Sequence, residues 1–144
     1  MEPVLQHVFE VLRNEYYCPD AIMLLQPTSP LRTVTHIDEA LQKFNQGDFD
    51  SLISIFKIYN NRHEINEKDC LTPTFKKSEN RDARPAVVFE NGAIYISSVD
   101  LIKEGRIRGD KIGYYEMDQY SSFDIDEPRD LFAAEAILKI QNKL

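Results

Sequence analysis

Two aspartates near the C-terminal end of the sequence could hold a divalent cation. Asp124 and Asp126 flank a single isoleucine in the segment Ser122–Asp130 (SFDIDEPRD). If this segment is extended, side-chain alternation places both carboxylates on one face, about 6.6 Å apart, where they repel by about 2.5 kcal/mol at an effective dielectric of about 20. A bound cation relieves that repulsion, and Mg²⁺ commonly takes one or two protein carboxylates together with phosphate oxygens and water. Asp124 and Asp126 are therefore candidate metal ligands and catalytic residues.

The same acidic residues have a purely structural alternative. The four acidic residues between 124 and 130 could crowd the first turn of a C-terminal helix, where the helix dipole favours negative charge. Acidic helix starts are common and Asp-x-Asp is a short motif, so the local sequence alone slightly favours this alternative. Only a second motif that points to the same chemistry can reverse that preference.

A second polar segment directly follows a short apolar run. Residues 24–32 (LLQPTSPLR) place the amide of Gln26 and the hydroxyls of Thr28 and Ser29 after that run. Ligands of open α/β sheets bind beyond the carboxyl ends of strands, and a glutamine can both donate to and accept from a hydroxyl-rich sugar acid. The two prolines of the segment fix its backbone, so that less entropy is lost when a ligand binds. The alternative is a proline-rich turn in which Thr28 and Ser29 only satisfy loop amides.

The elements that must position these segments alternate between helices and strands. Apolar residues recur at helical spacing over residues 3–16 and again over residues 35–46, which predicts two amphipathic helices, the second with Thr35 and Asp38 at capping-box spacing. The continuous apolar run 21–25 (AIMLL) is typical of a central strand that is buried on both faces of a parallel sheet. Residues 51–58 (SLISIFKI) are rich in β-branched and aromatic residues and predict a second strand. This order favours an α/β sheet flanked by helices.

The rest of the chain contains a long polar segment and then further regular elements. Residues 59–90 are too long for a structureless loop inside a compact domain, so they predict an arm that has short strands of its own and packs on a partner subunit. Regular structure then resumes with strands at 93–96 and 113–117, a short helix at 98–103 and a final helix that begins at Pro128. A chain of 144 residues with 42% hydrophobic content suits one compact domain, residues 1–144.

Composition and charge disfavour several classes of function. The net charge is -7 and the 17 Lys and Arg residues form no stripe, which argues against a nucleic-acid partner. No apolar run approaches the roughly 18 residues of a membrane span, and the first residues do not resemble a signal peptide, so a soluble cytoplasmic protein is predicted. Cys18 and Cys70 lack the spacing of metal ligands and are predicted to be buried thiols.

Three of these segments occur together in an order that resembles a known enzyme family. LLQPTSPLR, residues 90–96 (ENGAIYI) and SFDIDEPRD, in this order and with comparable gaps, are similar to the acylneuraminate cytidylyltransferases, also called CMP-sialic acid synthetases. The family includes relatives that act on bacterial legionaminic and pseudaminic acids. The resemblance runs from the first predicted helix to the last, and it reverses the preference in favour of a metal site at Asp124 and Asp126.

The resemblance implies a Rossmann-like nucleotidyltransferase fold and a Mg²⁺-dependent reaction. In that reaction the anomeric hydroxyl of a nonulosonic acid attacks the α-phosphorus of CTP and releases pyrophosphate, which requires positioning and charge neutralisation. Asp124 and Asp126 match the metal ligands of the family, and Gln26 matches its sugar-contacting glutamine. Family members are homodimers, and residues 59–90 are similar to their dimerisation segment. The further substrate-binding candidates are Thr28, Ser29, Asn91, Tyr95 and Arg81.

Two departures from the family limit what the resemblance implies. Phe89 stands where some sialic acid enzymes have an arginine, which leaves the identity of the sugar open. The family also has a glycine-rich loop that wraps the CTP phosphates ahead of these segments, whereas the five glycines of this chain begin at Gly47 and form no such loop. We therefore expect an N-terminally truncated cytidylyltransferase domain that binds CTP poorly. The alternative is a non-catalytic assembly module that dimerises through residues 59–90.

Overall fold

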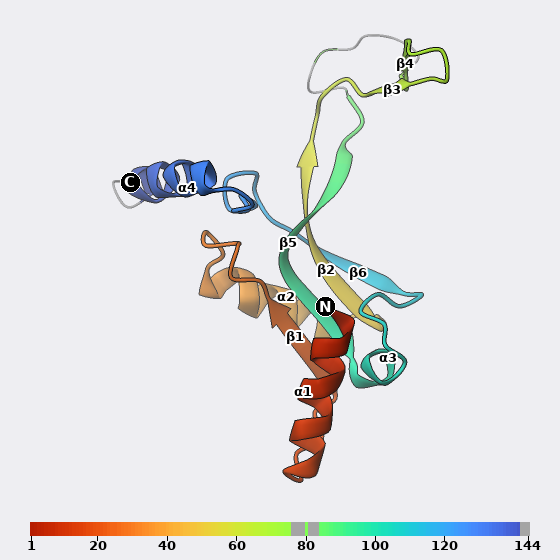
Figure 1. The fold of residues 1–144 in the computed structure, drawn as a ribbon, viewed down its shortest axis with the longest axis vertical. Helices are drawn as coiled ribbons and strands as arrows, with labels where there is room; N and C mark the ends of the chain where they lie inside the picture. Colours follow the sequence, from red (N-terminus) through yellow and green to blue (C-terminus); the bar gives the residue numbers. More distant parts are fainter. Residues whose placement is uncertain (76–79, 81–83, 142–144) are drawn as a thin grey trace.

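The computed structural model describes residues 1–75, 80 and 84–141, and it shows helices arranged around a mixed sheet (Figure 1). The predicted α/β class with flanking helices is therefore confirmed. The helices are α1 (Glu2–Asn14), α2 (Val34–Gln46), α3 (Val99–Lys103) and α4 (Pro128–Gln141). The strands are β1 (Ala21–Leu25), β2 (Ser51–Ile58), β3 (His63–Ile65), β4 (Leu71–Pro73), β5 (Val87–Ser98) and β6 (Ile112–Glu116).

The main sheet has four strands in the order β1-β5-β2-β6. β5 pairs antiparallel with both β1 and β2, and β2 pairs parallel with β6. The prediction that residues 21–25 form a central strand of a parallel sheet is wrong, because β1 lies at the edge of the described sheet and its partner there is the antiparallel β5. β1 is apolar at every position because both of its faces contribute to packed layers, a condition that does not require a strand on each side.

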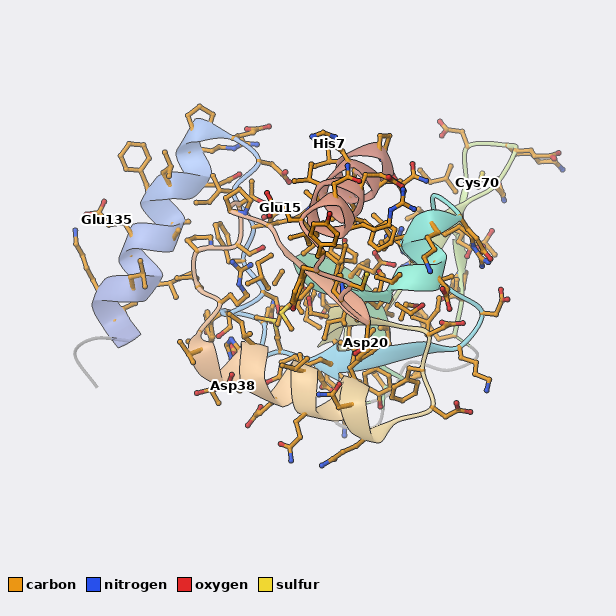
Figure 2. All side chains as sticks on the ribbon, turned by 90° about the horizontal axis from the view of Figure 1, so that it is seen from below. His7, Glu15, Asp20, Asp38, Cys70 and Glu135 are labelled. Carbon is orange, nitrogen blue, oxygen red and sulfur yellow. The ribbon has the colours of Figure 1, made fainter. Side chains whose placement is uncertain are left out.

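Helices cover both faces of this sheet. Figure 2 shows His7 of α1 and Asp38 of α2 on opposite sides of the strands. The buried cluster on the α1 side consists of Leu5, Phe9, Tyr95, Val99, Ile102 and Ile107, and the cluster on the α2 side consists of Ala40, Leu52, Ala93, Ile94, Ile96 and Met117. β5 contributes to both clusters, so it is the strand that joins the two layers of the core.

The start of α2 differs in detail from the sequence prediction. The capping box was expected at Thr35 and Asp38, but it lies two residues earlier, at Thr33 and His36. The backbone amide of His36 donates to Oγ1 of Thr33 at 3.4 Å, and the amide of Thr33 donates to Nδ1 of His36 at 3.1 Å. His36 therefore caps this helix, in the position where glutamate or glutamine is usual.

The predicted arm does contain short strands. β3 and β4 form an antiparallel hairpin in which His63 pairs with Pro73 and Ile65 pairs with Leu71. The hairpin projects away from the main sheet beyond β2 and β5 (Figure 1). Ile65 is 72% exposed and Leu71 is 70% exposed, so the hairpin presents apolar surface to solvent. Dimerisation through residues 59–90 stays a prediction.

Other exposed side chains correct further sequence predictions. Cys18 and Cys70 are exposed free thiols, where buried thiols were expected. Phe132 is 75% exposed on α4, a helix that lies apart from the sheet (Figure 1). Ala134 is the buried position of that helix. Neither α4 nor any other helix in the described part of the chain combines the length and the apolar content needed to cross a membrane.

Candidate functional site

The polar segment after β1 turns sharply and is held against β5 by an arginine. Nη1 of Arg32 donates to the carbonyl oxygen of Gln26 at 2.9 Å and to that of Ala93 at 2.7 Å. Burial lowers the pKa of Arg32, although a guanidinium stays charged in proteins. Arg32 was not among the residues that the sequence suggested, and its position within LLQPTSPLR was the available signal. It is a positioning residue that fixes where Gln26 emerges from the strand.

Gln26 lies directly against a glycine of β5. Gly92 has a φ of +73°, a left-handed conformation that favours glycine, and a Cβ at this position would come within 2.5 Å of Oε1 of Gln26. The Asn-Gly pair of ENGAIYI and the glutamine of LLQPTSPLR are thus in contact. Gln26 is half-buried, so its amide is positioned by packing and remains accessible to a ligand.

The same stretch of β5 bulges, and a buried serine fills the bulge. The pairing of β2 with β5 changes register between Ile53 and Ile55, where Ser54 is the intervening residue. Oγ of Ser54 accepts from the amide of Ile94 at 2.7 Å and lies 2.5 Å from Oδ1 of Asn91. Nδ2 of Asn91 donates to Oγ of Ser122 at 2.9 Å, so both ends of this amide are occupied inside the protein. Substrate contact by Asn91 stays a prediction, and the structure gives it the additional role of joining β5 to the start of SFDIDEPRD.

The aspartate segment passes beside the turn of LLQPTSPLR. The amide of Ile125 donates to the carbonyl oxygen of Thr28 at 2.9 Å. Oδ1 of Asp124 is buried and has no hydrogen-bond partner among the described residues, and the same is true of Oγ of Ser29. A buried carboxylate oxygen without a partner is costly, and a cation or a donor from a ligand would remove that cost. The hydroxyl of Ser29 does not satisfy a loop amide, which argues against the purely structural alternative for this turn.

The aspartate that stabilises the beginning of α4 is Asp130 and not Asp124. Oδ2 of Asp130 accepts from the amide of Asp126 at 3.0 Å and from that of Glu127 at 2.8 Å, which satisfies donors at the beginning of α4. Asp124 takes no part in this arrangement. Residues 123–126 are also not a strand, contrary to the extended conformation considered in the sequence, and Asp126 is exposed where Asp124 is half-buried. The structural alternative therefore explains Asp130 and leaves Asp124 unexplained.

Tyr95 lies beside a charged pair formed by Glu90 and Arg108. The hydroxyl of Tyr95 lies 3.5 Å from Oε2 of Glu90, and the guanidinium of Arg108 lies over its ring, 5.6 Å from the centroid. Burial raises the pKa of Tyr95, the charges of Glu90 and Asp124 raise it further, and Arg108 lowers it. Tyr95 therefore remains protonated near neutral pH. Glu90 and Arg108 were not among the sequence candidates.

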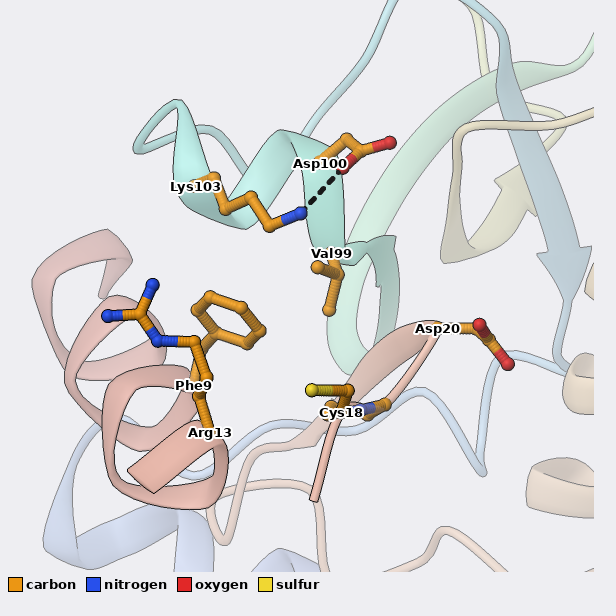
Figure 3. Close-up of a pocket in the computed structure, with 8 residues that line it drawn as sticks. Phe9, Arg13, Cys18, Asp20, Val99, Asp100 and Lys103 are labelled. Carbon is orange, nitrogen blue, oxygen red and sulfur yellow. Dashed lines mark hydrogen bonds and ion pairs between the residues drawn. The ribbon is translucent and has the colours of Figure 1, made fainter. Parts of the chain in front are cut away.

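Two other observations limit the extent of this site. Arg81, a sequence candidate, lies outside the described residues. A separate surface hollow of about 420 Å³ lies between α1, α3 and the amino end of β1, away from the Gln26 end of the strand, and it includes none of the residues that the sequence predicted (Figure 3). Its Lys103 is paired with Asp100 at 3.0 Å, as the dashed line in Figure 3 indicates.

The site offers few protein ligands to a metal ion. Within residues 1–75, 80 and 84–141, no group of three or more His, Cys, Asp and Glu side chains is placed to hold a metal ion. Mg²⁺ does not require such a group, because one or two carboxylates suffice when phosphate and water complete its shell. The unpartnered Oδ1 of Asp124, with Asp126 two residues away, fits that requirement.

Comparison with known proteins identifies relatives that share most of this chain. N-acylneuraminate cytidylyltransferase A of Danio rerio is 34% identical over 124 residues, which cover 81% of this chain and 28% of the relative. N-acylneuraminate cytidylyltransferase of Streptococcus agalactiae serotype III is 27% identical over 147 residues, covering 91% of this chain and 35% of the relative. The chain is related to the acylneuraminate cytidylyltransferase family. No family model matches it.

Two further comparisons define how much of the family the chain represents. Post-translational flagellin modification protein B of Campylobacter coli is 28% identical over 140 residues, covering 92% of this chain and 60% of that relative. The chain thus spans between 28% and 60% of the length of these curated relatives. The solved structure of 4-diphosphocytidyl-2C-methyl-D-erythritol synthase from Anaerococcus prevotii has a TM-score of 0.61 at 14% identity, and the match covers 92% of this chain and 64% of that one. This chain therefore shares the fold of that structure.

Proposed function

We propose that the chain forms the sugar-binding and metal-binding part of a cytidylyltransferase that transfers CMP from CTP to a nonulosonic, sialic-type acid. The anomeric hydroxyl oxygen of the sugar forms a bond to the α-phosphorus of CTP as the bond from that phosphorus to the bridging oxygen of pyrophosphate breaks. Pyrophosphate leaves, and the hydroxyl proton passes to solvent. The names of the curated relatives support the substrate class.

One observation carries the proposal: the buried, unpartnered Oδ1 of Asp124 lies in the segment that is hydrogen-bonded to Thr28. The two motifs that define the resemblance are distant in sequence, yet they meet in space at the carboxyl end of β1. This is the end of a strand at which open α/β sheets bind their ligands. A carboxylate held without a partner at such a place is suited to a cation that arrives with a substrate.

Different residues of the site would bind the metal ion and the sugar. Asp124 and Asp126 would hold Mg²⁺, which when bound neutralises charge on the phosphate oxygens that face the attacking hydroxyl. Gln26, fixed by Arg32 and Gly92, would orient the sugar through its amide, which both donates and accepts. The unpartnered hydroxyl of Ser29 offers a further donor at the same turn.

The proposal places recognition of the CTP phosphates outside residues 1–144. Among the five glycines of this sequence, Gly92 is used against Gln26, and the others do not form the glycine-rich loop that the resemblance associates with the phosphates. Chain 1–144 alone should therefore bind CTP weakly. Calorimetry that measured micromolar CTP binding by this chain would contradict that part of the proposal.

A thermal-shift titration with Mg²⁺ tests the metal assignment without relying on turnover. A ligand that binds the native state raises the unfolding midpoint, so millimolar Mg²⁺ should stabilise the wild-type chain. Asp124→Asn should abolish this response, and without Mg²⁺ its midpoint should not fall, because the substitution removes an unpaired buried charge. Asp126→Asn should weaken the response. In any form of the protein that releases pyrophosphate from CTP and a sugar acid, Asp124→Asn should reduce the rate at least about 100-fold.

The matched control for this titration is Asp130→Asn. Asp130 belongs to the same acidic segment but caps α4 through its side chain, so its substitution should lower the midpoint slightly and leave the Mg²⁺ response intact. A Mg²⁺ response that survives in Asp124→Asn, or one that is lost equally in Asp130→Asn, would refute the assignment of the metal to Asp124.

The exposed hairpin favours a second candidate function, a non-catalytic assembly module. β3 and β4 extend beyond the main sheet and expose Ile65 and Leu71, which is more apolar surface than such a small hairpin can bury by itself. We propose that residues 59–90 form a homodimer contact in a cytoplasmic protein, and this contact is compatible with either function.

Light scattering separates the contribution of the hairpin from that of the sheet. The wild-type chain should be a dimer, and Ile65→Ser combined with Leu71→Ser should give a monomer that keeps its Mg²⁺ response. A monomeric wild-type chain would argue against dimerisation through this segment. A dimer that shows no Mg²⁺ stabilisation would favour the assembly module over the enzyme.

A further inference from the structure

An acidic sugar must approach a site whose described carboxylates repel it. Asp124 and Asp126 lie at the turn of LLQPTSPLR, and Glu90 lies on the neighbouring β5 beside Tyr95. A metal ion bound together with the nucleotide can offset part of this negative charge. The carboxylate of the sugar nevertheless needs a hydrogen-bond donor of its own. A cationic side chain near the site with unused hydrogen-bond donors could bind this carboxylate.

Arg108 has unused hydrogen-bond donors because its guanidinium presents two edges and uses one of them. Nε donates to Oε1 of Glu90 at 3.1 Å, and Nη2 donates to Oε2 of Glu90 at 2.5 Å. A guanidinium carries five N–H donors, so both donors of Nη1 and the second donor of Nη2 have no partner among the described residues. The Nη1–Nη2 edge is the planar fork that matches a carboxylate in a bidentate arrangement.

Arg108 is also held in place before any ligand binds. Glu90 fixes one edge of the guanidinium, and the ring of Tyr95 supports its face at 5.6 Å. Tyr95 is 7% exposed, so its ring is held by the surrounding packing. A side chain restrained in this way loses little entropy when its free edge receives a ligand.

The other arginines near the site are used differently. Arg32 donates to two main-chain carbonyls and positions the turn. Arg106, two residues from Arg108, divides its two terminal nitrogens between Glu104 at 3.3 Å and Asp110 at 3.1 Å, so its fork is closed by acidic neighbours. Phe89, which stands where some related enzymes have an arginine, cannot supply a charge. Arg108 is therefore the described arginine that combines a fixed position beside Tyr95 with an open fork.

We propose that Arg108 binds the carboxylate of the acidic sugar through its Nη1–Nη2 edge and that Glu90 orients it for this purpose. The proposal rests on the proposed function, which supplies the acidic sugar, and it adds a specificity residue that neither the motifs nor the comparisons indicate. It predicts that recognition of the carboxylate is lost when the fork is lost, even where a positive charge remains.

The test compares binding of N-acetylneuraminic acid and of its carboxamide by titration calorimetry, with Mg²⁺ present. Arg108→Gln should weaken binding of the acid about 10- to 100-fold and should change binding of the carboxamide little, because the charge-assisted fork is absent from that pair. Arg108→Lys should recover only part of the loss, since an ammonium keeps the charge without the planar fork. Arg106→Gln is the matched control and should bind the acid as the wild type does.

The outcomes separate this inference from the proposed function. If the wild type binds the acid and Arg108→Gln binds it equally well, the inference is wrong and the proposed function stands. If the wild type does not distinguish the acid from its carboxamide, carboxylate recognition by Arg108 is refuted. If the wild type binds neither sugar and shows no Mg²⁺ stabilisation, both the inference and the proposed function fail.

Discussion

The amide of Ile125 donates a hydrogen bond of 2.9 Å to the carbonyl oxygen of Thr28, and this bond joins SFDIDEPRD to LLQPTSPLR. Because both groups belong to the main chain, the contact fixes the path of the backbone independently of the side chains. It places the unpartnered Oδ1 of Asp124 beside the turn that presents Gln26. The proposed metal ligand and the proposed sugar-orienting amide are thus held by two hydrogen-bonded segments of the main chain.

Gly92→Ala should disturb the site through Gln26. The substitution adds a Cβ within 2.5 Å of Oε1 of Gln26 and forces alanine into a φ of +73°, which should lower the free energy of unfolding by about 1–2 kcal/mol. The displaced amide should also reduce the affinity for a sugar acid. Urea unfolding measures the first effect, and calorimetry with N-acetylneuraminic acid measures the second.

Gly105→Ala provides the control for that experiment. Gly105 has a nearly identical φ of +74°, but its added Cβ would meet Nε2 of Gln6 at 3.2 Å, on the turn after α3. It should therefore destabilise the protein through the same backbone strain without changing sugar binding. Equal loss of binding in both variants would mean that global stability, and not the position of Gln26, determines the affinity.

Arg32→Gln should destabilise the turn more than an exposed arginine substitution does. The variant removes two hydrogen bonds from a charged, partly buried donor to main-chain carbonyls, so the free energy of unfolding should fall by about 1–3 kcal/mol. Arg129→Gln is the matched control, since Arg129 pairs with Glu127 at an exposed position and its loss should change stability by at most about 0.5 kcal/mol. Urea midpoints that shift equally would contradict a positioning role for Arg32.

The sequence predicted those elements whose signals are local. Residues 51–58 were predicted as a strand and form β2 with the same bounds, because β-branched residues fill the span and polar residues end it. A helix was predicted over residues 35–46 and α2 spans Val34–Gln46, but its cap was misplaced because His36 occupies the position where the motif usually has glutamate or glutamine. The run 21–25 was assigned to a central parallel strand because periodicity reports burial of two faces and does not report strand order or direction.

The features of the site that escaped prediction all depend on long-range contacts. Ser54 lies in an apolar strand, and nothing in its neighbours shows that it closes a bulge with Asn91. Arg108 and Glu90 form a fork only because the loop after α3 returns to β5. The composition of SFDIDEPRD could not separate Asp130, which caps a helix, from Asp124, which does not, since that difference depends on backbone directions. Local motifs therefore indicated the candidate site, and the fold determined which contacts each of its residues makes.

Asp130→Ala should loosen the beginning of α4 without affecting the metal. The side chain of Asp130 accepts from the amides of Asp126 and Glu127, so its removal leaves two donors unsatisfied and should cost about 1 kcal/mol. Hydrogen exchange at those two amides should accelerate. Unchanged exchange would show that solvent replaces the carboxylate at no cost, and a lost Mg²⁺ response would show that Asp130 contributes to the metal site.

Asp50→Asn should change how stability depends on acid. The amides of Lys111 and Asp110 donate to Oδ2 of Asp50 at 3.0 and 2.9 Å, and these bonds, led by that from Lys111, lower the pKa of the carboxyl from its ordinary value. A carboxyl whose pKa is lower in the folded state contributes stability that is present above its unfolded pKa of about 3.9 and is lost as the pH falls through the folded value. The wild type should therefore exceed Asp50→Asn in urea midpoint at pH 7, and the difference should shrink below about pH 4. The control is Asp48→Asn. Among the described residues, the carboxylate of Asp48 contacts only Nζ of Lys111, so its removal should change the urea midpoint little at either pH. A constant difference between wild type and Asp50→Asn down to pH 2 would contradict the role given to these two amides.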